Sequence, residues 1–155
     1  MKDNEVRKTL SPVVEAFQAG LGDNLVSLVL FGSRARGSAH SESDWDLLVI
    51  ITGLPDKILK RNRSLLALLP LSWRCRVSVL AKSPAEFEAV LSSLYLDIAL
   101  DGIVLYDRHG YIREKLGYIR RRIKQMGLKR QKLNEDWLWS WKRPPGINWE
   151  LEWSS

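Results

Sequence analysis

Two aspartates separated by one residue, Asp44 and Asp46, are well suited to bind a divalent cation. They stand directly ahead of the apolar run 47–51, which predicts a buried strand. Alternate side chains of a strand share a face, so the two carboxylates would lie together and repel each other. A hard cation such as Mg²⁺ or Mn²⁺ removes that repulsion, because it prefers carboxylate oxygens as ligands. We predict a metal site here, although turns before strands also favour Asp, which leaves a structural interpretation open.

A turn rich in glycine, serine and arginine lies ahead of the two acids. Gly32 and Ser33 follow the apolar run 25–31, and a glycine there lets the backbone approach a ligand closely. Free backbone N–H groups, with the cations Arg34 and Arg36, would bind phosphate. The turn would thus hold phosphate oxygens, and the acids a metal ion that bridges them. Phosphoryl and nucleotidyl transfer need this arrangement, because they depend on positioning and on neutralising charge.

The string GSRARGSAHSESDWDLLVI, residues 32–50, strongly resembles the signature of the minimal nucleotidyltransferases in the DNA polymerase β superfamily. A looser resemblance extends over about residues 10–108. It implies an α+β fold in which a mixed β-sheet is flanked by helices, as in the polymerase β palm. It also implies that an acceptor hydroxyl attacks the α-phosphorus of a nucleoside triphosphate, with ATP the expected one, and releases pyrophosphate. The matching positions are Gly32, Ser33, Ala35, Arg36, Gly37, Ala39, Ser43, Asp44 and Asp46.

The same resemblance implies roles for individual residues and a partner. Asp44 and Asp46 would be catalytic and would hold Mg²⁺ or Mn²⁺. Short members of the family often pair with a small helical protein and act as the antitoxin of a two-component toxin system, modifying a tyrosine of that partner with nucleotide. A helical protein partner is therefore expected. The nucleotide's phosphates would be bound by Gly32, Ser33, Arg34, Arg36 and Ser43.

This chain departs from the family at the third carboxylate, which active members usually supply from the following strand. We predict that strand over residues 73–80, and Ser78 occupies the position of the third acid. A serine carries no charge. On a regular strand Ser78 would share its face with Arg74 and Arg76, so the side turned toward the acidic pair would be cationic.

Two hypotheses follow from this departure. In the first, the chain is an enzyme in which Asp44 and Asp46 suffice, or in which Asp97 or Asp101 supplies the third acid. In the second, it is a weakened or inactive relative that binds nucleotide or a protein, and its arginines neutralise the aspartates. We favour the first, because both acids and the phosphate-binding turn are intact and metal binding is their most economical use.

Helices and strands alternate along the chain, which favours a single sheet flanked by helices. Ser11 and Pro12 form a good helix start. Ser83 begins another helix with a capping-box pattern that should run to about Leu100. The predicted strands are 25–31, 47–51, 73–80 and 103–106, and the predicted helices are 11–19, 55–69, 83–100 and 111–126.

We expect a nucleotidyltransferase domain over residues 1–110 and an extension over 111–155 that consists of a basic helix and a Trp-rich tail. The net charge is +6, yet the segment 111–132 alone holds nine Lys or Arg and one acid. Such a segment could make the chain a nucleic-acid-binding module. No helix-turn-helix, zinc or RNA-binding signature accompanies it, so we favour a protein partner or the domain's own surface.

The tail holds five of the seven tryptophans. Trp137, Trp139 and Trp141 alternate, which predicts an extended segment with one aromatic face. Indoles in that number are expected to be covered, either by the domain or by a partner. A homo-oligomer is therefore a further hypothesis.

The longest apolar runs fall far short of the roughly 18 residues that a membrane span needs. The N-terminus mixes both charge signs and lacks the apolar stretch of a secretory signal. We therefore expect a cytoplasmic protein without a membrane segment. The single cysteine, Cys75, is predicted to be a buried strand residue, because it lies in the apolar and cationic stretch WRCRVSVL.

Overall fold

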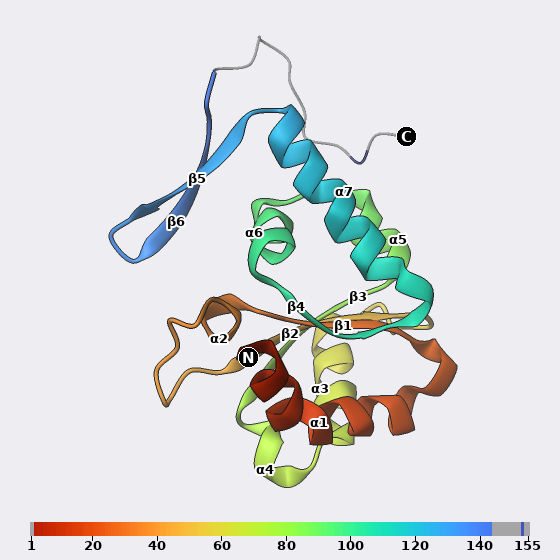
Figure 1. The fold of residues 1–155 in the computed structure, drawn as a ribbon. Coiled ribbons are helices and arrows are strands. Elements are labelled where there is room, and N and C mark those ends of the chain that lie inside the picture. The colour runs from red at the N-terminus through yellow and green to blue at the C-terminus, as the bar shows by residue number, and fades with distance from the viewer. Residues whose placement is uncertain (1, 144–152, 154–155) are drawn as a thin grey trace.

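Residues 2–143 and 153 are described by this computed structural model (Figure 1). The strands of its main sheet are β1 (Leu25–Phe31), β2 (Trp45–Ile51), β3 (Val77–Lys82) and β4 (Ile103–Asp107), in the order β3-β2-β1-β4. β1 pairs antiparallel with β2 and β4, whereas β2 and β3 are parallel. The predicted mixed sheet of an α+β fold is confirmed.

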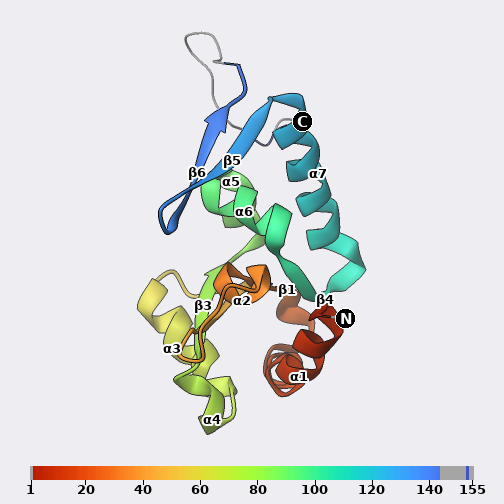
Figure 2. The ribbon, with the colours of Figure 1, turned by 60° about the vertical axis from the view of Figure 1, so that its left-hand side comes forward.

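Helices cover both faces of this sheet (Figures 1 and 2). Alternation along β2 sends Leu47 and Val49 into one apolar core, and Leu48 and Ile50 into the other. The first core packs under α1 (Lys2–Leu21), α3 (Ile58–Leu68) and α4 (Leu71–Arg74), and the second under α5 (Pro84–Ala89), α6 (Ser93–Asp101) and α7 (Tyr111–Gln125). The remaining short helices are η1 (Gly22–Asn24), α2 (Gly32–Arg36) and η2 (Arg108–Gly110).

α1 begins well before the predicted helix. Val6 and Leu10 extend upstream the apolar face that continues to Phe17, and all three are buried. Pro12 lies inside the helix on its exposed side. The prediction that Ser11 and Pro12 start the helix is therefore wrong, because burial of two further apolar side chains outweighs the backbone hydrogen bond that proline removes.

The predicted strand 73–80 is wrong at its start, since β3 begins at Val77. Pro70 leads into the short helix α4, and the buried Trp73 of that helix packs edge-on against Trp45 with ring centroids 6.1 Å apart. Cys75 follows α4 and is exposed, so the prediction of a buried strand residue is also wrong. The packing of Trp73 in the core thus places residues 73–76 in α4 and the turn after it, and not in the strand that the alternating pattern favoured.

The predicted helix 83–100 divides into α5 and α6. The capping box at its start is confirmed, because Ser83 and Glu86 exchange side-chain and backbone hydrogen bonds. The chain leaves the helical conformation at the β-branched Val90, whose φ is −138°, and Ser92 precedes α6. Two short helices instead of one long one cover the second core.

A buried arginine joins the two helical layers. Arg61 of α3 donates two hydrogen bonds to the Glu86 carboxylate, at 2.9 and 2.7 Å, and a third to the carbonyl of Pro55. The Arg61 hydrogen bonds, helped by the backbone of Ser83, lower the pKa of Glu86 to about 2. A carboxylate with a lowered pKa stabilises the fold above its ordinary range, and this stabilisation is lost as the pH falls toward about 2.

The basic helix α7 is confirmed, and its apolar side is buried against the second core. Several of its cations are bound by the protein itself. Lys115 pairs with Glu88 at 2.5 Å, and Arg120 donates to the carbonyl of Ala99. Across residues 2–143, none of the helices combines the length and the apolar character that crossing a bilayer requires.

After α7 the chain forms a hairpin of β5 (Leu128–Leu133) and β6 (Asp136–Trp141). The predicted extended segment with alternating tryptophans is confirmed in β6, whereas β5 was not expected. Trp139, Trp141 and Trp153 pack against the second core, so part of the aromatic tail is covered by the domain. Trp149 lies outside the described residues.

Candidate functional site

The turn after β1 brings its glycine against one of the two acids. Gly32 has φ +74°, a left-handed conformation that favours glycine. A Cβ at this position would lie 2.3 Å from Oδ2 of Asp46, so a side chain here would displace the carboxylate. The short helix α2 ends at Gly37, where the N–H groups of Gly37 and Ser38 donate to the carbonyl of Ser33. Ala35 is the buried residue of this short helix.

Asp46 lies in β2 between its neighbours Phe31 of β1 and Ser78 of β3. Its side chain is half-buried and shares the sheet face of Leu48 and Ile50, the face that α5, α6 and α7 cover. Asp44 is exposed and precedes the strand by one residue. The two acids therefore sit at the rim of the sheet, where β1 ends and β2 begins.

The electrostatics of the site favour a cation. Burial raises the pKa of Asp46, the negative charge of Asp44 raises it further, and the guanidinium of Arg36 lowers it. The negative charge of the ionised Asp46 is thus only partly compensated by the positive charge of Arg36. Two carboxylates of this kind match the oxygen ligands that Mg²⁺ and Mn²⁺ prefer.

Arg34 is engaged by the loop that leads to the acids. Its Nε and Nη2 donate to the carbonyl of Ser43, at 3.2 and 2.8 Å, and Nη2 also donates to that of Ser41. Its guanidinium lies over the indole of Trp45, 4.6 Å from the ring centroid. A side chain held in this way ties α2 to the segment that carries Asp44.

The loop is also closed on itself. The hydroxyl of Ser43 accepts from the N–H of His40 at 2.9 Å, and the N–H of Ser43 donates to the carbonyl of His40. Phosphate binding by Arg34 and Ser43 stays a prediction, since both are engaged within the loop. Gly32, Arg36 and the acids were brought together by the fold as expected.

The position at which active members of the family carry a third carboxylate is occupied by Ser78. Ser78 lies directly beside Asp46 in the parallel register of β2 and β3, and it is exposed. Among residues 2–143 and 153, no group of three or more His, Cys, Asp or Glu side chains could hold a metal ion. Any cation at this site would rely on two carboxylates of this chain, together with ligands from a nucleotide or water.

The expectation that arginines line the face of Ser78 is wrong. Arg74 belongs to α4, where its guanidinium donates to the carbonyls of Leu69 and Ala67. Arg76 precedes β3 and stacks over Trp73, 4.7 Å from the ring centroid. Neither arginine forms an ion pair with Asp44 or Asp46 in the described part of the chain. The hypothesis that they neutralise the acids has no support, because the strand starts too late to align them.

The alternative in which Asp97 or Asp101 supplies the missing acid has no support in the structure. Both belong to α6, and both bind Arg130 of β5. Nη1 of Arg130 lies 3.1 Å from Asp97, and Nη2 donates to Asp101 at 2.9 Å. The indole of Trp139 donates to Asp97 as well. These carboxylates hold the hairpin on α6 and are engaged there.

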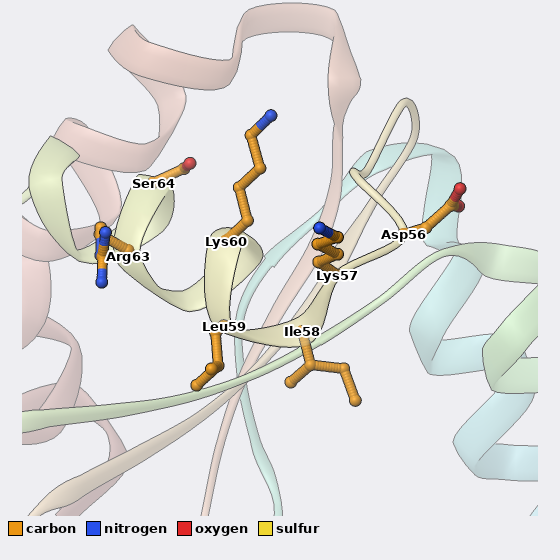
Figure 3. A pocket seen from close by; sticks show the side chains of 7 residues that line it. All are labelled: Asp56, Lys57, Ile58, Leu59, Lys60, Arg63 and Ser64. Carbon is orange, nitrogen blue, oxygen red and sulfur yellow. The ribbon is translucent and has the colours of Figure 1, made fainter.

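A surface pocket of about 870 Å³ lies away from the acids. Its residues belong to the loop after β2 and the first turns of α3, at the opposite end of β2 from Asp46. Figure 3 shows Ile58 and Leu59 pointing to the same side of the chain, away from Lys60. No carboxylate pair faces this pocket, so it is not the place of the chemistry.

Comparison with known proteins places the chain in a family. The sequence model of the nucleotidyltransferase domain matches residues 10–133. Protein MJ1305 of Methanocaldococcus jannaschii, provisionally named a protein adenylyltransferase, is 29% identical over 130 residues, which are 81% of this chain and 88% of that protein.

Solved structures of low sequence identity share the fold. A toxin-antitoxin with AMP-PNP has a TM-score of 0.55 and 16% identity, and covers 74% of this chain and 86% of its own. A mutant of the MntA-HpeT toxin-antitoxin has a TM-score of 0.53 and 14% identity, over 81% of this chain and 89% of its own. The resemblance to nucleotidyltransferases is confirmed by the family model, and these structures share the fold.

Proposed function

Because this chain belongs to the nucleotidyltransferase domain family, we propose that it transfers AMP from ATP to a hydroxyl of a protein partner. The observation that carries the proposal is the contact of Gly32 with the half-buried Asp46, beside Asp44 and Arg36. A turn that admits phosphate against two acids is what nucleotidyl transfer requires.

Each residue of the proposed site has a separate role. Asp44 and Asp46 would hold Mg²⁺ or Mn²⁺, which would neutralise part of the triphosphate charge. Gly32 allows the phosphates to approach the backbone, and Arg36 adds a positive charge beside them. The acceptor hydroxyl would lose its proton to solvent water as its oxygen bonds to the α-phosphorus, while the bond from that phosphorus to the bridging oxygen breaks and pyrophosphate leaves with that electron pair. Arg34 positions the loop of Asp44 through its bonds to Ser43.

The nature of the acceptor is supported by the relatives. MJ1305 is provisionally named a protein adenylyltransferase. Two structures of the same fold are toxin-antitoxin complexes, one of them with the ATP analogue AMP-PNP. We therefore infer that the acceptor is a tyrosine hydroxyl of a small helical protein, for which this chain acts as the antitoxin.

Transfer of label from α-labelled ATP tests the proposal. We expect the purified protein to bind AMP-PNP in the presence of MnCl₂ and to transfer label to a co-expressed helical protein encoded beside it. EDTA should abolish transfer, because without a divalent cation the two carboxylates would repel the negatively charged triphosphate. Transfer that persists in EDTA, or label from γ-labelled ATP in place of α-labelled ATP, would contradict the proposal.

Restoring a charge beside Asp46 should strengthen the site. In Ser78→Asp a third carboxylate occupies the neighbouring position of the parallel strand, so we expect tighter Mn²⁺ binding and a transfer rate raised about tenfold, equivalent to about 1.4 kcal/mol. Calorimetric titration of Mn²⁺ and initial rates measure the two effects. Ser78→Asn has a similar shape without the charge and should change neither. An equal response to both variants would show that charge at this position is irrelevant.

A further inference from the structure

The hairpin of β5 and β6 presents one protected and one unprotected strand edge. Figures 1 and 2 show it projecting from the body of the molecule. β5 reads LKRQKL and carries three cations, whereas β6 reads DWLWSW and carries one charge, at its first residue Asp136. Charged side chains, lysine above all, keep edge strands from pairing with other chains. β6 lacks this protection.

The exposed apolar side chains of the hairpin gather at its far end. Leu133 is 58% exposed, Leu138 49% and Trp137 36%. A two-stranded hairpin is marginal by itself. Here its base is fixed to α6 by the ion pairs of Arg130 with Asp97 and Asp101. Leu133 and Leu138 project from one face of this far end and Trp137 from the other, whereas Trp139 and Trp141, nearer the base, pack against the second core.

The register of the hairpin sets which backbone groups face outward. Leu133 pairs with Asp136 across a two-residue turn. Such a turn is closed by a hydrogen-bonded pair, so the N–H and C=O groups of Trp137 and Trp139 point to the outer edge of β6. Within residues 2–143 and 153, β6 has β5 as its strand partner and no other.

We propose that a second copy of this chain covers this edge, with the two β6 strands paired antiparallel about a twofold axis. The resulting sheet has four strands in the order β5-β6-β6-β5. Charge selects this occupant, because the pairing joins the two weakly charged edges and leaves the cationic β5 strands outermost. An isologous contact of this kind closes as a dimer. The inference concerns assembly and goes beyond the proposed function.

Solution mass and one pair of matched variants test this dimer. Sedimentation equilibrium of the full chain should give twice 17.8 kDa at micromolar concentration. Pairing about the middle of β6 places Leu138 near the axis. Leu138→Lys would bring two like charges together there and should raise the dimer dissociation constant at least about 100-fold. Gln131→Lys adds the same charge to the directly opposite residue on the outer strand, and should leave the dimer intact.

Disulfide trapping provides a second measurement that does not depend on mass. In a Cys75→Ser background, Leu138→Cys should give a covalent dimer on mild oxidation, and Gln131→Cys should not. A wild-type monomer at all concentrations would overturn the proposal. A dimer that responds equally to the two lysine variants, or equally to the two cysteine variants, would place the contact elsewhere and overturn it as well.

Discussion

Asp46→Asn is expected to abolish nucleotidyl transfer and to leave the protein folded. The carboxylate lies in β2 against Gly32 and interacts electrostatically with Asp44, so in the proposed function it would hold the metal ion beside the phosphates. An amide keeps the shape but cannot neutralise a divalent cation, so we expect the rate to fall by roughly 10³-fold or more. Asp44→Asn should act in the same direction, and the double variant should be no more active than either.

The melting temperature of Asp46→Asn distinguishes a specific loss of catalysis from a loss of activity caused by a damaged fold. Burial and Asp44 raise the pKa of Asp46, so its ionised form destabilises the folded state at neutral pH. Removing that charge should therefore raise the melting temperature at neutral pH, and the gain should shrink below the usual range of aspartate. Asp56→Asn, in the loop beyond the opposite end of β2, is the control: it should not change the rate and, because Asp56 interacts favourably with Arg61, it should not raise the melting temperature. A drop in melting temperature along with activity would show that Asp46 is structural.

The parts of the site that could be predicted are those set by local rules. The turn at Gly32 and the acids at Asp44 and Asp46 follow from strand alternation and glycine chemistry, which act within a few residues. The position of Ser78 came from the resemblance to the family, whose active members carry a third carboxylate on the following strand. These rules were enough to find one sheet, its central strands and the place where they meet α2.

What could not be predicted depends on side-chain contacts that local sequence patterns do not specify. Arg34 looked like a phosphate ligand, yet its bonds to the carbonyls of Ser41 and Ser43 depend on the path of a loop that has no periodic signal. Arg130 reaches across to Asp97 and Asp101, and this pairing removes two acids that otherwise looked available.

Apolar packing also overrode local patterns. Trp73 fits an alternating strand pattern but packs on Trp45 from a short helix, which delays β3 and turns Arg74 and Arg76 away from the acids. The strand β5 escaped prediction because its sequence is mostly cationic and shows no apolar alternation. The contact of Trp73 with Trp45 joins segments that are far apart in the chain, which a local pattern does not record.

Gly32→Ala should cost about 100-fold in transfer rate, although the change adds a single methyl group. The new Cβ would lie 2.3 Å from Oδ2 of Asp46, so the carboxylate must move from the position in which it would hold the proposed metal ion. A displacement of about 1 Å at a reacting centre can cost roughly 10²-fold. Alanine at φ +74° also strains the backbone by about 1 kcal/mol. The rate constant and the dissociation constant of Mn²⁺ report the displacement.

Gly53→Ala separates this displacement from backbone strain. Gly53 has φ +72°, and a Cβ there would meet nothing within 4 Å. The two alanine variants should therefore lose similar stability, measured by urea denaturation, while transfer and Mn²⁺ binding fall in Gly32→Ala alone. Equal activity in the two variants would mean that the close contact between Gly32 and Asp46 has no part in catalysis. The acids would then have to hold their ligand on the side turned away from the α2 turn, with the phosphates approaching from elsewhere.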